Sequence, residues 1–226
     1  MKKSSKLYPS IDFYTQVDYN ISVKVRGGIM NYTEKLKKLI CEKNGFIITS
    51  DLAEHNIPRQ FLKQFVELGL LEKIDRGAYI SPETFDDEMY RLQARFRPII
   101  YSHDTALYFH NLIDRDPIEY TVTVYSGYQT TKLKEMGINT FSIKKDLFEL
   151  GLSEGETIFG RPIRMYDAER AICDCIRSRS KMDVAIITDA LKRYVKSGNK
   201  SIPKLMRYAE LFKISSIVRG YLEVLL

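Results

Sequence analysis

The spacing of hydrophobic residues between Phe46 and Ile80 changes from that of a strand to that of helices and back again. The expected elements, in order, are a strand at Phe46–Ile48, a short helix opened by Thr49 or Ser50, a turn at residues 56–58, a second helix ending at Leu68, and two strands joined at residues 75–77. Helix, turn, helix and hairpin in this order are typical of a winged helix-turn-helix. Gly69 and Gly77 are expected to adopt positive φ, because they follow a helix and form the hairpin turn.

The second helix of this stretch separates its residues by face. The residues expected in the core are Phe61, Leu62, Phe65 and Val66, and those expected on the open face are Arg59, Gln60, Lys63, Gln64 and Glu67. Arg and Lys donate hydrogen bonds to guanine edges or to phosphates, and Gln pairs with adenine in both directions. The open face therefore indicates a DNA-reading helix.

Residues outside this helix complete the predicted DNA surface. Arg76 at the hairpin tip is placed like a wing residue that enters a narrow minor groove. The full set of candidate DNA contacts is Thr49, Ser50, Arg59, Gln60, Lys63, Gln64, Lys73 and Arg76. The alternative is an ordinary solvated helix face on a protein-docking module.

The segments on either side set the boundaries of this domain. Thr33 is expected to cap a first helix that ends at Gly45, and Pro82 closes the hairpin. We therefore assign residues 30–82 to the DNA-binding domain. Residues 1–29 are interpreted as a leader or flexible arm, because Met30 is a plausible alternative start.

Residues 83–226 predict a mixed α/β domain with a helical C-terminus, so the chain as a whole is expected to be α+β. The expected strands are residues 99–101, 120–125, 140–143, 157–159 and 163–166, and the expected helices among them are residues 84–96, a helix capped by Ser102, and residues 129–136. From Asp167 the pattern predicts helices only, with Asp167 and Ser201 as N-caps of two of them.

The net charge of +6 is spread unevenly along the chain. Residues 177–226 hold 11 Lys and Arg against 4 Asp and Glu, whereas residues 82–176 hold 11 against 16. The basic residues near the turn at Gly198 are Lys192, Arg193, Lys196, Lys200, Lys204 and Arg207. This basic patch is expected to bind either flanking DNA phosphates or another nucleic acid or acidic protein surface, unless it is merely solvated.

Other features restrict the class of protein. No apolar run approaches the ~20 residues of a membrane span, and no signal-peptide core follows the basic start, so a cytoplasmic protein without a membrane partner is expected. The three cysteines are interpreted as reduced thiols, and neither a metal nor a cofactor is expected. Without a phosphate-binding glycine loop or an informative Ser, His or Cys arrangement, the chain is not expected to be an enzyme. His103 and His110 are read as structural or surface histidines.

Four segments resemble the AbiEi-type antitoxins of bacterial abortive-infection toxin–antitoxin systems. They are residues 70–80 (LLEKIDRGAYI), 101–112 (YSHDTALYFHNL), 120–125 (YTVTVY) and 166–173 (YDAERAIC). The serine-histidine segment followed by the Asp-x-Glu-Arg helix start is more specific than the hairpin, which many regulators share. The resemblance covers residues 31–226.

This resemblance implies a two-part phage-defence protein. The winged domain is expected to repress the antitoxin–toxin operon by binding its operator, as a monomer or a weak dimer on DNA. The C-terminal domain is expected to neutralise a nucleotidyltransferase-like toxin without a stable complex. Tyr166, Asp167, Glu169 and Arg170 match the family's helix start, where their role is either functional or structural.

Two other functions fit the same sequence. One is a stand-alone transcriptional regulator whose C-terminal domain senses a ligand, and ligand-induced release of the operator would distinguish it. The other is an enzyme guided to DNA by its winged domain, which nuclease or nucleotide-transfer activity would reveal.

Overall fold

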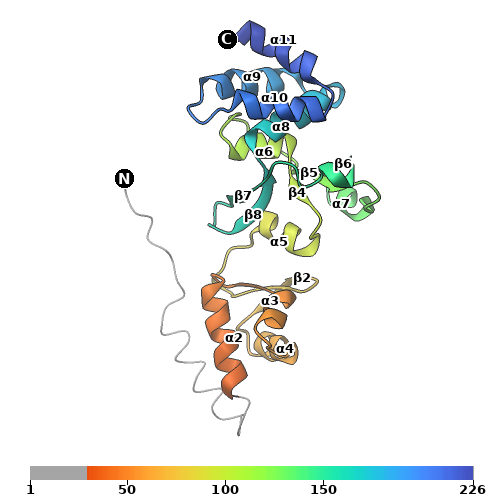
Figure 1. The fold of residues 1–226 in the computed structure, drawn as a ribbon. Coiled ribbons are helices and arrows are strands. Elements are labelled where there is room, and N and C mark those ends of the chain that lie inside the picture. Colours follow the sequence, from red (N-terminus) through yellow and green to blue (C-terminus); the bar gives the residue numbers. More distant parts are fainter. Residues whose placement is uncertain (1–29, 226) are drawn as a thin grey trace. The chain divides into compact units, whose positions relative to one another are not determined.

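The computed structural model of the protein describes residues 30–225, and the predicted leader at residues 1–29 lies outside them. The chain forms an α+β protein of two compact units (Figure 1). We call them the N-terminal unit, which extends to Arg95, and the C-terminal unit, which begins at Phe96.

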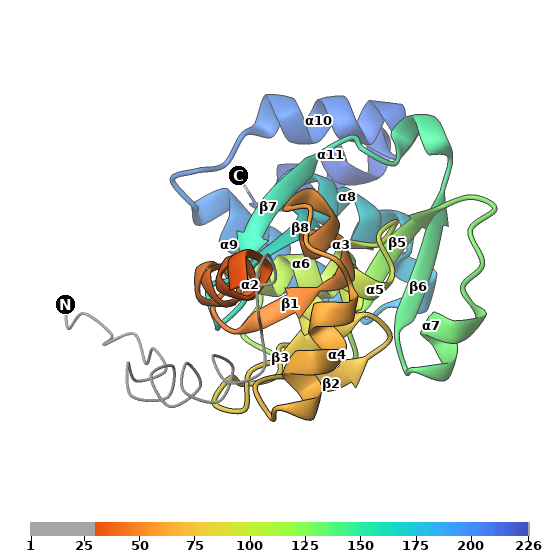
Figure 2. The same ribbon diagram turned by 90° about the horizontal axis from the view of Figure 1, so that it is seen from below.

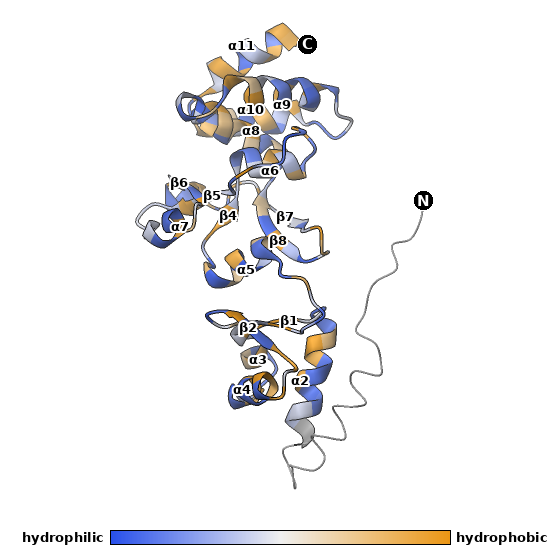
Figure 3. Ribbon diagram, turned by 180° about the vertical axis from the view of Figure 1, so that it is seen from behind, coloured by the Kyte–Doolittle hydropathy of each residue, from blue (hydrophilic) through white to orange (hydrophobic). Residues whose placement is uncertain are grey.

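The N-terminal unit packs its helices around a small antiparallel sheet. Its elements are α2 (Met30–Glu42), β1 (Phe46–Ile48), α3 (Thr49–Glu54), α4 (Gln60–Glu67), β2 (Glu72–Asp75), β3 (Ala78–Ile80) and α5 (Glu88–Arg95). The strand order is β1-β3-β2, so β3 pairs with both of the other strands (Figure 2). The core is formed by one side of α2, α3 and α4, where Leu36, Leu52 and Phe61 are almost completely buried. Figure 3 shows both hydrophobic and hydrophilic residues along α2 and α4, as amphipathic helices require.

Three expectations for this unit differ from the structure. Thr33 lies buried inside α2 and does not cap it, because the helix already begins at Met30. Val66 is 36% exposed, because the buried stripe of α4 is completed by Phe61, Leu62 and Phe65. The unit also extends beyond the hairpin to include α5, whose Tyr90 ring packs edge-on against Phe46 at 5.0 Å.

The C-terminal unit is built on a five-stranded mixed sheet with the order β6-β5-β4-β8-β7. Its strands are β4 (Ile100–Tyr101), β5 (Thr121–Tyr125), β6 (Asn139–Ile143), β7 (Leu152–Glu156) and β8 (Pro162–Tyr166). The central strand β4 runs antiparallel to β5 and parallel to β8. β5 and β6 are parallel, whereas β7 and β8 form an antiparallel hairpin.

Helices of the C-terminal unit gather into a layer beside this sheet (Figure 1). They are α6 (His103–Phe109), α8 (Ala168–Arg177), α9 (Val184–Lys196), α10 (Ile202–Leu211) and α11 (Ser215–Leu225), whereas α7 (Thr131–Glu135) packs against β6. α8 is the centre of the layer, since it packs against α6, α9, α10 and α11. Asp167 and Ser201 cap α8 and α10 as expected, because their side chains accept hydrogen bonds from the backbones of Arg170 and Lys204. Among residues 30–225 no helix is both long and apolar enough to cross a membrane.

The predicted strand at residues 157–159 is wrong. The residues that pair with β8 are those of β7, and residues 157–161 form the loop of this hairpin. Thr157 Oγ1 accepts hydrogen bonds from the backbones of Phe159 and Arg161, and Gly160 has a φ of +70°. These local bonds compete with strand pairing, and they leave Ile158 91% exposed.

Ser102 precedes α6 as expected, but its side chain does not cap the helix. Its hydroxyl accepts a hydrogen bond from Thr123 and lies 2.9 Å from Nδ1 of His103. The other ring nitrogen, Nε2, lies 3.2 Å from the hydroxyl oxygen of Ser178. His103 is completely buried at a φ of +52°, stacked on Phe141. It therefore has the structural surroundings expected of it.

Candidate functional site

The outward face of α4 carries four of the predicted DNA contacts. The residues on this face are Gln60, Lys63, Gln64 and Glu67, together with Arg59 at the N-cap, and all of them are exposed. Lys63 forms an i,i+4 ion pair with Glu67 at 3.7 Å. Because Phe61, Leu62 and Phe65 are buried on the opposite side, the helix presents a polar face to solvent while its apolar face anchors it.

Thr49 and Ser50 differ from the other candidates, because both are only half exposed. The backbone N–H and the hydroxyl of Thr49 both donate to the carbonyl oxygen of Gly77, at 2.9 Å and 3.2 Å. The cap of α3 is supplied by Asp51, whose Oδ2 accepts from the Ile48 backbone at 2.9 Å. The hydroxyl of Thr49 therefore fastens the hairpin to the start of α3.

The hairpin tip presents two further predicted contacts to solvent. Arg76 lies in the turn between β2 and β3, and Lys73 lies on β2, and both are exposed. Gly77 has a φ of +78° and Gly69 a φ of +70°, which confirms the expectation for both glycines. The turn is tight, since a Cβ atom on Gly77 would lie 2.4 Å from the Thr49 hydroxyl oxygen.

A charged cluster that the sequence did not reveal lies at the base of this turn. Asp75 accepts hydrogen bonds from Arg95 Nη1 at 2.8 Å and 3.0 Å and lies 3.7 Å from Arg91 Nη1. Burial alone would raise the pKa of the Asp75 carboxyl, but the hydrogen bond from the Arg76 backbone and the two arginines lower that pKa below its usual value. Asp75 is separated from Arg95 by 20 positions, so no periodicity in the sequence connects them.

A comparison with solved structures finds similarity in fold over most of the chain. The chain is similar in fold to the RV2827C protein from Mycobacterium tuberculosis. The TM-score is 0.52 at 12% sequence identity, and the match covers 80% of this chain and 71% of that chain. No protein-family model and no curated protein matches the sequence. The similarity supports the arrangement of elements and carries no information about activity.

The predicted motif at the start of α8 forms an ion cluster in the C-terminal unit. Lys204 Nζ contacts Asp167 at 3.0 Å and Glu169 at 3.2 Å. Tyr194 donates to Glu169 at 2.8 Å, and Tyr208 donates to Asp167 at 3.1 Å. Burial opposes the charge of Glu169, but the hydrogen bonds of Tyr194 and Lys204 lower its pKa. These contacts join α8 to α9 and α10.

Arg170 occupies a second, fully buried position on α8. Its Nε donates to Asp174 at 2.9 Å, and its Nη1 donates to the carbonyl oxygens of Leu147 and Leu150. Its guanidinium lies 4.1 Å from the ring centroid of Tyr166 and 4.6 Å from that of Phe212. The Tyr166 hydroxyl in turn donates to the carbonyl of Phe148. The motif residues therefore connect α8 to the segment after β6.

The predicted basic patch is divided between paired and unpaired charges. Lys204 belongs to the ion cluster, Arg193 is bonded to Asp114, and Lys192 lies 3.9 Å from Asp189. The three remaining members are Lys196, Lys200 and Arg207, which are exposed and have no acidic partner in the described part of the chain. The positive surface is consequently smaller than the residue count indicates.

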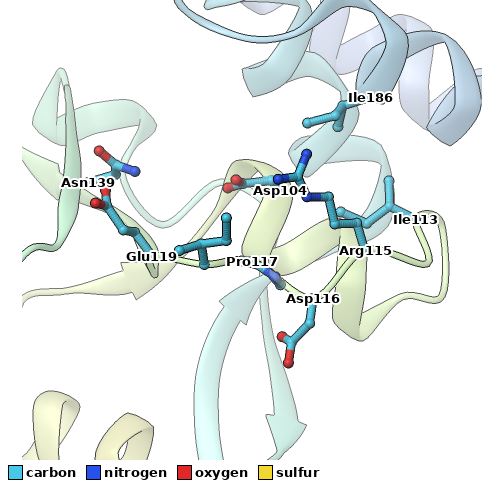
Figure 4. A pocket seen from close by; sticks show the side chains of 9 residues that line it. Asp104, Ile113, Arg115, Asp116, Pro117, Glu119, Asn139 and Ile186 are labelled. Carbon is cyan, nitrogen blue, oxygen red and sulfur yellow. The ribbon is translucent and has the colours of Figure 1, made fainter.

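An open hollow in the C-terminal unit is drawn in Figure 4. Its lining combines polar and apolar side chains: Asp104, Ile113, Arg115, Asp116, Pro117, Ile118, Glu119, Asn139 and Ile186. Burial raises the pKa of Asp104, although hydrogen bonds from Thr121 and the backbone of Thr105 oppose this shift. Within residues 30–225, no cluster of three or more His, Cys, Asp or Glu side chains is arranged to hold a metal ion.

Proposed function

We propose that the N-terminal unit is a winged helix-turn-helix that binds operator DNA, with α4 as the recognition helix and the β2–β3 hairpin as the wing. The proposal rests mainly on α4, whose apolar face is buried while its donor side chains are exposed. Such a face suits the major groove, and Arg76 at the hairpin tip suits a narrow minor groove. Lys73 on the same hairpin adds a charge for phosphates.

A pair of matched lysine variants tests this assignment. Lys63→Ala and Lys38→Ala each remove one lysine from an exposed i,i+4 ion pair, since Lys38 lies 3.8 Å from Glu42 on α2. If α4 reads bases, Lys63→Ala weakens binding to the duplex upstream of its own gene by about 1–3 kcal/mol and changes sequence preference, whereas Lys38→Ala does neither. Fluorescence anisotropy with this duplex and a scrambled one measures both effects. Equal behaviour of the two variants would exclude α4 as the reading helix.

We further propose that the protein is the cytoplasmic, autorepressing antitoxin of an abortive-infection system, and that its C-terminal unit counteracts a nucleotidyltransferase-like toxin. The sequence resemblance supports this function, and the ordered motif at the start of α8 gives the resembling residues a defined place. The test is co-expression with the product of the adjacent reading frame. The full chain with Arg59→Ala and Lys63→Ala should rescue growth without repressing its promoter. Absence of rescue by the parent protein would refute the antitoxin assignment.

The hollow in Figure 4 favours a second candidate, a regulator that senses a small ligand. Its carboxylates, the guanidinium of Arg115 and its isoleucines form the mixture of polar and apolar groups found in small-molecule sites. A metabolite that releases the operator from the parent protein, but not from an Arg115→Ala variant, would support this function over the antitoxin.

A further inference from the structure

The tip of the β2–β3 hairpin is fastened on two sides within the N-terminal unit. On one side, Thr49 donates two hydrogen bonds to the carbonyl of Gly77. On the other side, Asp75 accepts a hydrogen bond from the Arg76 backbone at 2.6 Å and binds Arg95 of α5. The two-residue turn of Arg76 and Gly77 therefore lies between two anchors, one on α3 and one on α5.

We propose that Asp75 is a positioning residue for DNA binding, which holds Arg76 at a fixed point by anchoring the hairpin tip to α5. This inference rests on the proposed DNA-binding function of the unit. Asp75 itself does not contact DNA, since its side chain is 13% exposed and is occupied by arginines. Asp75 holds the hairpin tip in one conformation before DNA binds, and this lowers the entropy cost of binding.

The charge of Asp75 makes this role testable, because electrostatics and positioning predict opposite changes in DNA affinity when the charge is removed. A carboxylate beside a DNA-binding tip repels phosphates, so simple electrostatics predicts tighter binding when its charge is removed. Positioning predicts the opposite, because Asp75→Asn releases Arg95 and loosens the tip. The effect is expected to pass through Arg76, which is the exposed residue next to the anchor.

Duplex binding by the full-length protein distinguishes the two mechanisms. We expect Asp75→Asn to bind the upstream duplex about tenfold more weakly and to lower the salt slope by about one, because the charge of Arg76 is no longer held in the minor groove between the phosphates. The control is Glu72→Gln, which removes an exposed charge from the same strand and should bind as tightly as the parent or more tightly. In an Arg76→Ala background, Asp75→Asn should cause no further loss.

Each outcome of this experiment supports or overturns the inference. The inference would be overturned if Asp75→Asn bound the duplex as tightly as the parent or more tightly. It would also be overturned if Asp75→Asn caused the same loss of affinity in the Arg76→Ala background. If Asp75→Asn does not fold, Arg95→Lys serves instead, because it keeps the positive charge but loses the planar guanidinium. The loss of duplex affinity caused by Arg95→Lys should also vanish in the Arg76→Ala background. If the parent binds no duplex, the proposed function fails together with the inference. If the parent binds and Asp75→Asn strengthens binding, only the inference fails.

Discussion

Replacing Arg170 by Met should destabilise the C-terminal unit more than any other single substitution in the motif at the start of α8. Arg170 is completely buried, and its guanidinium holds Asp174 and the carbonyls of Leu147 and Leu150. Methionine fills much of the same volume between the rings of Tyr166 and Phe212, so the packing loss is modest. The variant therefore isolates the polar contribution.

The expected magnitude follows from the groups left behind. Without Arg170, the buried carboxylate of Asp174 retains only Arg177, at 3.6 Å, as an ionic partner among the described residues. Removing one partner of a buried ion pair costs about 3–5 kcal/mol, since the other charge remains out of water. The carbonyl oxygens of the half-buried Leu147 and Leu150 also lose their donor. The free energy of unfolding should thus fall by at least about 3 kcal/mol.

Urea unfolding, monitored by the hydrogen exchange of backbone amides in α8, measures this change in the C-terminal unit alone. Arg193→Met is the control, because it breaks an ion pair with Asp114 in which both side chains are largely exposed, and it should change stability little. Arg170→Lys should also be destabilised, since a lysine cannot reproduce the contacts of the planar guanidinium. If Arg170→Met is as stable as Arg193→Met, the motif arginine is not structural, and a direct functional role becomes the better explanation.

Two further changes have defined outcomes. The pKa of buried His103 is lowered to about 4, so between pH ~6.5 and ~4 the unfolded chain binds more protons, and stability should fall by about 3 kcal/mol as the pH drops through this window. His103→Asn keeps a residue that tolerates positive φ and should flatten this dependence in urea unfolding; an unchanged pH slope would contradict it. Gly77→Ala should destabilise the protein more than Gly69→Ala, because only the added Cβ at residue 77 meets Thr49; equal melting temperatures would refute this steric argument.

Features set by neighbouring residues were predictable from the sequence. The buried and open faces of α4 apart from Val66, the caps at Asp167 and Ser201, and the positive φ of Gly77 each depend on a few adjacent positions. The β7–β8 hairpin was misplaced because Thr157 and Gly160 form a loop whose sequence also suits a strand. Here local hydrogen bonds outweighed β propensity.

Contacts between distant residues could not be predicted in the same way. The bond from Arg95 to Asp75 spans 20 positions and joins the hairpin to α5, which lies in the N-terminal unit beyond the expected end at residue 82. In the sequence alone, Asp75 is indistinguishable from an ordinary turn residue. The candidate DNA surface was therefore predicted from α4 and Arg76, whereas the anchor beneath it became visible only in three dimensions.

The same limit explains why counting lysines overstated the basic patch. Lys204 is four positions after Lys200 and appears equivalent to it in the sequence, but its amine lies between Asp167 and Glu169. Burial lowers the pKa of Lys204, and the two carboxylates more than offset this effect, so it stays charged while its field is largely cancelled. A partner that carries phosphates would therefore gain affinity from Lys196, Lys200 and Arg207, and little from Lys204. The charge available to a partner depends on how the fold pairs its lysines, and Lys204 is already paired with the carboxylates at the start of α8.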